Sequence, residues 1–342
     1  MESVFKGSEQ FNTSNQVVSA TCPSNIALIK YWGKYANQMP ANPSISYTLN
    51  HCNTQTSMEF LANEPFSVQT FLAGNEELKF AEKIEKYFKN IEQYLPWILK
   101  GKYIIKTENT FPHSSGIASS ASGFGAIASC LMELDKVFTN KEIDVKKTSF
   151  LARLGSGSAC RSLYNGLVVW GKTDEVEGSS DLFAVKYPDE EIHPIFKNFN
   201  DWVLLIHEGQ KTVSSTVGHG LMNTNPYAER RFQKARENFV PLKEILKTGN
   251  LEKFITLVEH EALTLHAMMM MSEPAFILMK TGTLEVINKL WEFREETGNP
   301  LFFTLDAGAN VHLLFPENES SEAIKNFIET ELLQHTQNGG VV

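Results

Sequence analysis

A run of small residues that opens directly into an apolar helix limits the folds open to this chain more than any other segment. Residues 112–123 read Pro-His-Ser-Ser-Gly-Ile-Ala-Ser-Ser-Ala-Ser-Gly. From within this run, Ala121, Phe124, Ala128 and Leu131 follow one another at a helical period. Small residues let a ligand approach the backbone, and a helix N-terminus offers unpaired N–H groups. The segment therefore indicates either a phosphate-binding loop or a serine-rich loop that only caps a helix.

The same run matches neither of two common nucleotide-binding patterns. It has no Gly-x-x-x-x-Gly-Lys-Ser/Thr of a Walker loop and no Gly-x-Gly-x-x-Gly of a dinucleotide fold.

Hydrophobic patterning and turn residues predict strands at residues 17–20, 44–49, 103–107, 166–170, 201–207, 302–305 and 311–315. They predict helices at 82–88, 121–131, 147–154, 226–247 with a break near Pro241, 251–271, 284–291 and about 321–333. The helix at 82–88 is expected to be exposed, and that at 284–291 to be amphipathic, with Leu284, Ile287 and Trp291 on its apolar face. A mixed α+β protein follows from this order of elements.

The length of the chain, 342 residues, is about twice that of a typical domain. A loop rich in proline and acidic residues precedes residue 199. We place a boundary there, between an N-terminal α+β domain at residues 1–199 and a C-terminal α+β domain at residues 200–342.

Composition excludes several classes of protein. A formal net charge of −9 argues against a protein that coats nucleic acid, and no apolar run approaches the roughly 20 residues of a membrane helix. The first residues lack the apolar stretch of a secretory signal. The four cysteines are too widely spaced for a zinc framework: Cys22, Cys52, Cys130 and Cys160. We therefore expect a cytoplasmic protein with no nucleic-acid or membrane partner.

A second loop of small residues ends in an arginine. Residues 155–161 read Gly-Ser-Gly-Ser-Ala-Cys-Arg and precede the apolar strand Leu167–Trp170. A guanidinium between apolar segments requires an anionic partner, and it binds a carboxylate or a phosphate through two hydrogen bonds. The sequence leaves two partners open for Arg161, a ligand or an internal Asp or Glu.

Two lysines and one aspartate stand out among apolar residues. Lys30 and Lys34 are four residues apart, so they lie on one side of the chain if this stretch is helical, and an anion would relieve their repulsion. Asp306 begins the sequence Asp-Ala-Gly-Ala-Asn between two predicted strands. That sequence is common in turns, yet a carboxylate held between strands is also a candidate catalytic base.

Other charged residues have simpler interpretations. His260 and His266 are six positions apart on a predicted helix, so they point in different directions and do not form a zinc pair. We predict that Arg230, Arg231 and Lys234 form a solvated face of a helix.

Taken together, five motifs resemble those of the diphosphomevalonate decarboxylase family. They are Cys22–Lys34, Gly116–Gly123, Gly155–Arg161, Val213–Thr216 and Thr304–Gly308. They occur in the order found in the family and spread over nearly the whole chain, and the first and third are close to diagnostic. The serine loop alone is shared with the wider superfamily of galactokinase, homoserine kinase, mevalonate kinase and phosphomevalonate kinase.

This resemblance implies the two-domain α+β fold of the small-molecule-kinase superfamily. Its N-terminal domain would be ribosomal protein S5 domain 2-like and bind ATP, and its C-terminal domain would be ferredoxin-like and carry the catalytic aspartate. The implied cofactors are ATP and Mg²⁺, and the implied assembly is a homodimer. The implied reaction, in the mevalonate pathway of isoprenoid biosynthesis, is ATP-dependent decarboxylation of mevalonate 5-diphosphate to isopentenyl diphosphate with release of ADP, phosphate and CO₂.

The resemblance also implies roles for the matching residues. Asp306 would be the catalytic carboxylate, with Lys30 beside the reacting centre, and Arg161 would bind the substrate carboxylate. The substrate, largely its diphosphate, would be held by Tyr31, Lys34, Ser156, Ser158, Ser215 and Thr216. ATP would be bound by Ser114, Ser115, Gly116, Ala118, Ser119, Ser120 and Ser122, of which Ser120 also counts as catalytic. Some relatives carry arginine at the position of Thr216. The resemblance does not identify which residues bind the metal.

Three alternatives stay open. The chain could be a decarboxylase of mevalonate 5-phosphate, or a mevalonate-type kinase that phosphorylates its substrate and stops. It could also be a ligand sensor without catalysis. The presence of both Lys30 and Asp306 favours decarboxylation, since relatives that only phosphorylate tend to lack that pair.

Overall fold

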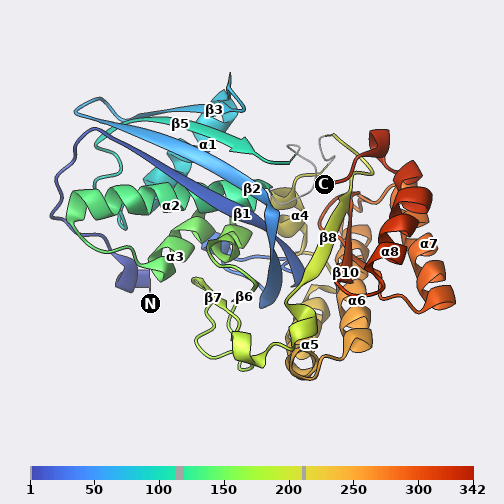
Figure 1. Ribbon diagram of the computed structural model, residues 1–342. Helices are drawn as coiled ribbons and strands as arrows, with labels where there is room; N and C mark the ends of the chain where they lie inside the picture. The colour runs from blue at the N-terminus through green and yellow to red at the C-terminus, as the bar shows by residue number, and fades with distance from the viewer. Residues whose placement is uncertain (1, 112–118, 210–212) are drawn as a thin grey trace.

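The N-terminal part of the molecule is one long sheet with helices packed on one face (Figure 1). The structure, a computed structural model, describes residues 2–111, 119–209 and 213–342. The strands are β1 (Gln16–Ile29), β2 (Ser44–Ala62), β3 (Ser67–Leu72), β4 (Asn75–Glu76), β5 (Gly101–Asn109), β6 (Leu167–Trp170) and β7 (Ala184–Lys186), and the helices are α1 (Leu78–Ile91), α2 (Ser119–Thr139) and α3 (Val145–Gly155). The strand order is β4-β3-β5-β2-β6-β7, with β1 paired antiparallel to β2.

The C-terminal part is richer in helix. It contains β8 (Phe199–Leu204), β9 (Phe302–Thr304), β10 (Val311–Pro316), α4 (Ser215–Leu221), α5 (Ala228–Thr248), α6 (Leu251–Met270), α7 (Thr281–Thr297) and α8 (Ser321–Phe327). The three strands form an antiparallel sheet in the order β8-β10-β9. Val342 extends the β8 edge, where its N–H and C=O both bond to the backbone of Val203. The mixed α+β class predicted from the sequence is confirmed.

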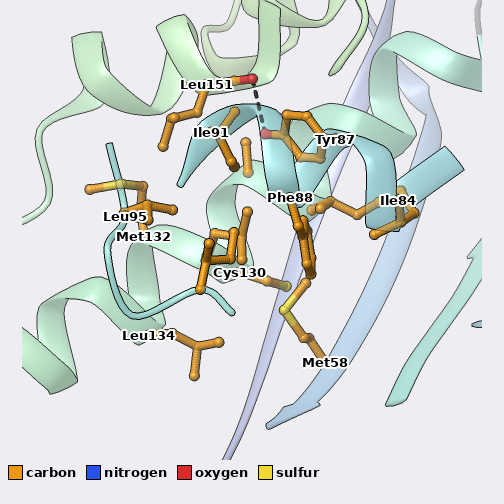
Figure 2. Close-up of a cluster of buried hydrophobic side chains, with 14 of the residues drawn as sticks. Met58, Ile84, Tyr87, Phe88, Ile91, Leu95, Cys130, Met132, Leu134 and Leu151 are labelled. Carbon is orange, nitrogen blue, oxygen red and sulfur yellow. Dashed lines mark hydrogen bonds between the residues drawn. The ribbon is translucent and has the colours of Figure 1, made fainter. Parts of the chain in front are cut away.

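The main core lies between the large sheet and its three helices (Figure 2). Met58 of β2 packs in one cluster with the apolar faces of α1 and α2, and α1 contributes the ring of Phe88 to it. The hydroxyl of Tyr87 donates a hydrogen bond to the carbonyl of Leu151 at 2.9 Å, which ties α1 to α3. The long apolar face of α2 predicted from its period is therefore confirmed.

A second apolar cluster joins the two parts of the chain. Ile29 of β1 and Val169 of β6 pack with Phe239 of α5, Phe254 of α6 and Phe302 of β9, and all five side chains are buried. The ends of the large sheet are thus fixed against α5, α6 and the small sheet.

The helices in the described part of the chain are all too short or too polar to cross a bilayer.

The first predicted strand is longer than expected. A short strand at 17–20 with a break at Pro23 is wrong, because β1 continues from Gln16 to Ile29. Its pairing with β2 shifts register between Pro23 and Ser24, and a bulge of this kind tolerates a proline. The helix considered for Lys30 and Lys34 is also wrong, since β1 ends at Ile29 and irregular backbone follows.

Three expectations about helices also need correction. α5 is continuous through Pro241, because buried neighbours such as Phe239 and Leu242 hold the helix on both sides of the missing N–H. α1 is amphipathic rather than exposed, and its side chains at 84, 87, 88 and 91 are buried. α7 exists as predicted, but Leu284 and Trp291 are exposed and its buried face runs through Val286 and Leu290.

Candidate active site

A pocket lies where the N-terminal and C-terminal parts meet. Its walls come from the end of β1, the start of α2, the turn of 3-10 helix Gly157–Leu163, α4 and the turn after β9. Of the residues selected from the sequence, it brings together Lys30, Tyr31, Lys34, Ser119, Ser120, Ser156, Ser158, Arg161, Ser215, Thr216 and Asp306. Segments more than 270 positions apart in the sequence therefore converge on one site.

The centre of the pocket is an ion pair between Lys30 and Asp306. The lysine Nζ lies 3.7 Å from the carboxylate; the lysine side chain is 1% exposed and that of the aspartate 28%. The ammonium has no hydrogen-bond partner among the described residues. Burial lowers the pKa of Lys30 to about 8, and the charges of Asp306 and Glu261 limit that fall while those of Arg161 and Arg231 add to it. The ammonium is therefore buried, cationic near neutral pH and free to bind an anion.

The turn that carries Asp306 is fixed by hydrogen bonds to its backbone. A ring nitrogen of His266 lies 3.0 Å from the carbonyl oxygen of Asp306, and Gly308 N–H donates to the same oxygen. Three residues further on, Thr283 of α7 donates to the carbonyl of Ala309. The carboxylate thus projects from a rigid backbone, which suits a group that must meet a reacting atom.

Arg161 is a buried cation in the same pocket. Its guanidinium donates to the side-chain oxygens of Asn25 at 3.2 Å and Ser44 at 2.6 Å, and the residue is 3% exposed. No carboxylate of the described chain lies within ion-pair distance of it. Burial lowers the pKa of Arg161, yet a guanidinium stays charged in proteins. Of the two partners left open by the sequence, the internal Asp or Glu is therefore wrong.

Serine hydroxyls form one wall of the pocket, the serine wall. Ser119 and Ser120 begin α2, and the hydroxyl of Ser156 lies 3.5 Å from that of Ser120. Ser158 stands in the neighbouring turn. Ser122 lies away from the pocket: it is fully buried and accepts a 2.6 Å hydrogen bond from Thr54 of β2. The remaining residues expected to bind ATP, Ser114, Ser115, Gly116 and Ala118, lie outside the described residues.

Polar and cationic side chains surround the pocket mouth. Lys34 donates to the side-chain oxygen of Gln38 at 2.8 Å, and Lys83 of α1 lines the same pocket. Burial and the charge of Lys34 lower the pKa of Lys83. Tyr31 has a buried hydroxyl with no partner among the described residues, and burial raises its pKa. Two lysines close enough to repel each other favour a polyanionic ligand.

α4 brings the last two selected residues to the site. Ser214 caps this helix by accepting from Val217 N–H, and Ser215 and Thr216 line the pocket. Nδ1 of His219 accepts a 2.9 Å hydrogen bond from Gly33 N–H, so α4 is joined to the segment that follows β1.

The sequence did not indicate several residues of this site. Lys83 stands on a helix that looked merely exposed, and Gln38 and His219 lie in segments without a recognisable motif. Asn25 falls inside the first motif, but its contact with Arg161 joins residues 136 positions apart. Only the folded chain places these side chains at the pocket.

Comparisons with known proteins agree along the length of the chain. Residues 22–183 match the family described as diphosphomevalonate decarboxylase-like N-terminal domain, and residues 202–339 match the mevalonate 5-diphosphate decarboxylase C-terminal domain. Diphosphomevalonate decarboxylase of Saccharomyces cerevisiae is 32% identical over 323 residues, which cover 88% of this chain and 78% of that protein.

Solved structures give the same result. Mevalonate diphosphate decarboxylase from Staphylococcus aureus is similar with a TM-score of 0.82 and 28% identity, covering 96% of this chain and 95% of that one. A structure of MDDEF in complex with MVAPP, AMPPCP and magnesium gives a TM-score of 0.81 at 28% identity and covers 96% of each chain. The two-domain fold expected from the motifs is confirmed. Sequence and structure agree that this chain belongs to the diphosphomevalonate decarboxylase family.

Proposed function

We propose that this chain catalyses the ATP-dependent decarboxylation of mevalonate 5-diphosphate to isopentenyl diphosphate, ADP, phosphate and CO₂. One observation carries the proposal: the buried Lys30 ammonium faces the Asp306 carboxylate in a pocket that also holds Arg161, a buried cation. A base, an anion-stabilising cation and a carboxylate-binding arginine are the groups that this reaction requires. Family membership supports the same activity.

The reaction needs a base because a tertiary alcohol is a poor leaving group. Its oxygen must first become a phosphate ester, by transfer of the terminal phosphoryl group of ATP. Asp306 would accept the proton of the 3-hydroxyl, or orient that hydroxyl toward ATP, from its fixed turn. A positioned general base contributes about 10²- to 10⁴-fold to such a step.

Lys30 would stabilise negative charge during phosphoryl transfer. Its ammonium is buried and without a hydrogen-bond partner in the described chain, so it can bind a phosphoryl oxygen without first losing a hydrogen bond. Phosphoryl transfer depends mainly on alignment and charge neutralisation, and fixed charges act strongly in a pocket with little water. After transfer, loss of phosphate leaves positive character at C3, which the Asp306 carboxylate can stabilise.

Arg161 would bind the substrate carboxylate that leaves as CO₂. Asn25 and Ser44 hold the guanidinium through two of its nitrogens, Nε and one terminal amino group. Strong pairing with a carboxylate stabilises the ground state, so the contribution of Arg161 is orientation more than activation. It would hold the C–CO₂ bond in line for cleavage.

The two phosphate chains would occupy neighbouring parts of the pocket. Ser119 and Ser120 at the start of α2 suit ATP, since hydroxyls and a helix N-terminus both bind phosphate. The substrate diphosphate would be bound by Tyr31, Lys34, Ser156, Ser158, Ser215 and Thr216. Thr216 is neutral, so cations for this diphosphate come from Lys34 and Lys83.

Magnesium fits this site only together with phosphate ligands. Asp306 is the single carboxylate among the described pocket residues, and no cluster of three His, Cys, Asp or Glu in the described chain could hold a metal. Mg²⁺ commonly binds through one or two carboxylates, substrate phosphates and water. Serine hydroxyls such as Ser120 would complete its coordination, and the bound ion would neutralise phosphate charge.

A direct test is a paired assay of ADP and CO₂ with mevalonate, its 5-phosphate and its 5-diphosphate. We expect equal amounts of ADP and CO₂ from the diphosphate and little of either from the other two. ADP without CO₂ would identify a kinase, and preference for the 5-phosphate would identify the related decarboxylase. ATP binding with neither product would identify a sensor.

We also propose a cytoplasmic homodimer with a domain boundary near residue 199. The four cysteines are all buried thiols, which suits a reducing compartment. The two family matches end at 183 and begin at 202, on either side of the proposed boundary. Light scattering in solution and the cellular position of a tagged chain test the assembly and the location.

A further inference from the structure

A buried ion pair of the C-terminal part contacts the backbone of Lys30. Arg231 of α5 and Glu261 of α6 meet at 2.6 Å, and each side chain is only 1% exposed. The same guanidinium donates to the second carboxylate oxygen at 3.2 Å, and Asn238 donates to that oxygen at 2.6 Å. The expectation that Arg231 belongs to a solvated helix face is therefore wrong.

This pair also contacts the backbone of Lys30 on both sides. Glu261 accepts the Lys30 N–H at 2.9 Å, and Arg231 lies within 3.3 Å of the Lys30 carbonyl, to which it donates. Asn42 donates to the same carbonyl at 3.0 Å. Both peptide groups that flank the Lys30 side chain are thus held by charged or polar side chains, although β1 has already ended.

The burial of the Arg231–Glu261 pair indicates that its role is not stability alone. An ion pair taken out of water recovers little more than its desolvation cost, so a buried pair is weak evidence for stability alone. Charge-assisted hydrogen bonds to a backbone are strong and directional. The backbone of Lys30 in turn determines where its ammonium lies relative to Asp306, 3.7 Å away.

We propose that Arg231 and Glu261 are a positioning pair that holds the backbone of Lys30 and so fixes its ammonium at the reacting centre. The inference rests on the proposed function, because it takes Lys30 and Asp306 as reacting groups. It assigns to two residues outside the recognised motifs a role that acts through Lys30, without contact with the substrate.

The pair also sets the field around the ammonium. Four charged groups act on Lys30: the carboxylates of Asp306 and Glu261 raise its pKa, and the guanidiniums of Arg161 and Arg231 lower it. Neutralising Glu261 alone leaves Arg231 unopposed, so the pKa of Lys30 should fall below its present value of about 8. Neutralising both partners should return it toward that value.

The chain contains a matched control on the same helix. Glu259 is two residues before Glu261 and forms a comparable ion pair with Arg294 at 2.7 Å, with its carboxylate 8% exposed. It bonds to Trp291 of α7 and lies outside the pocket lining. Glu259→Gln therefore removes a similar charge from α6 without touching Lys30.

The kinetic test compares Arg231→Lys, Glu261→Gln and Glu259→Gln with mevalonate 5-diphosphate and ATP. Lysine keeps the charge of Arg231 but cannot bond both Glu261 oxygens and the Lys30 carbonyl together. We expect Arg231→Lys and Glu261→Gln to lose about tenfold or more in kcat, with KM for ATP changed by less than about threefold. Glu259→Gln should keep its kcat. Folding of each variant is checked by circular dichroism. If Glu261→Gln does not fold, the kinetic constants of Arg231→Lys alone decide the test.

A second measurement does not depend on activity. Titration of ¹³C-labelled lysine by NMR, with Lys30 assigned through Lys30→Arg, should show a lower pKa in Glu261→Gln and recovery in Glu261→Gln/Arg231→Gln. The double variant should nevertheless keep a low kcat, because the backbone contacts are lost. Folded variants with near wild-type kcat and an unchanged Lys30 pKa would overturn the inference, as would an equal loss in Glu259→Gln. Absence of CO₂ from the wild type would instead refute the proposed function, and the NMR comparison would still test the positioning pair.

Discussion

At the scale of single residues, this site is defined by two buried cations, Lys30 and Arg161, neither of which donates a hydrogen bond to a carboxylate of the described chain. Arg161 donates its hydrogen bonds within the described chain to neutral oxygens, and Lys30 meets Asp306 at 3.7 Å, longer than a hydrogen bond. A protein of formal net charge −9 has many carboxylates available for such cations. Burying cations without hydrogen bonds to carboxylates costs stability, and the anionic substrate and ATP are the partners that would offset the cost.

Asp306→Asn is the most direct residue-scale prediction. Asparagine keeps the size of the side chain but cannot accept a proton, so we expect turnover to fall by at least about a hundredfold. ATP binding should change little, since the serine wall is unaltered. Steady-state kinetics and calorimetric titration with a non-hydrolysable ATP analogue measure the two effects. A near-normal kcat would remove Asp306 from the mechanism.

At the scale of elements, α4 is held against the segment that follows β1 by very close packing. A Cβ added at Gly218 would lie 2.6 Å from two ring carbons of Trp32, whereas one added at Gly220 would meet no atom within 4 Å. Both glycines are on the same short helix. Only the first therefore controls how near Ser215 and Thr216 come to the pocket.

Gly218→Ala should displace α4 from Trp32. We expect KM for mevalonate 5-diphosphate to rise about tenfold while KM for ATP stays constant, because ångström-scale misplacement weakens a binding site strongly. Gly220→Ala is the matched control and should leave both KM values unchanged. Alanine is favoured over glycine in a helix by about 1 kcal/mol, so this substitution should not destabilise α4. Equal effects of the two substitutions would contradict this account of α4.

The contact between α4 and Gly33 also predicts a pH dependence. Nδ1 of His219 accepts the Gly33 N–H, which requires a neutral ring, and the ring lies between Tyr31 and Trp32. Burial, with a smaller contribution from the charge of Lys34, lowers the pKa of His219 to about 3. The unfolded chain binds a proton near pH 6.5, so this histidine makes the fold less stable as pH falls from 6.5 toward 3.

Between pH 7.5 and 5, His219 should remove about 2 kcal/mol from the free energy of unfolding. His219→Asn keeps an acceptor for the Gly33 N–H but does not titrate. Between pH 7.5 and 5, the free energy of unfolding of this variant should therefore fall by about 2 kcal/mol less than that of the wild type. Urea denaturation of both proteins at the two pH values measures the difference. Parallel pH dependences would show that His219 takes up its proton over the same pH range in the folded and the unfolded chain.

At the scale of the whole molecule, the two parts of the chain share a core. The cluster around Ile29, Phe239, Phe254 and Phe302 takes side chains from both sheets and from the helices between them. Figure 1 shows α5 and α6 lying beside the small sheet at the end of the large one. Neither part can unfold without exposing apolar surface of the other.

We therefore expect one cooperative unfolding transition despite two domains. Far-ultraviolet circular dichroism and tryptophan fluorescence should give coincident melting curves, because Trp32, Trp97 and Trp170 are buried in different clusters of the same structure. Phe254→Ala should lower the whole transition, without splitting it, by about 3–5 kcal/mol. Two separate transitions would mean that the shared cluster does not couple the parts.

Much of the fold was predictable because its signals are local. The period of α2, the turn after β9 and the helix boundaries of α6 depend on neighbouring residues, and these predictions are confirmed. The errors have tertiary causes. Pro23 is accommodated by a bulge against β2, and Pro241 by buried side chains on each side of it.

The sequence by itself determined which chemical groups this protein has: two loops of small residues, a lysine after one strand, an arginine after a loop and an aspartate in a turn. Each of these is a local property of the chain. Only the tertiary structure decided how they are paired. Lys30 faces Asp306 instead of Lys34, Arg161 has no carboxylate, and Arg231 is buried with Glu261. Such pairings join residues up to 276 positions apart, and packing of the whole chain determines which of them form.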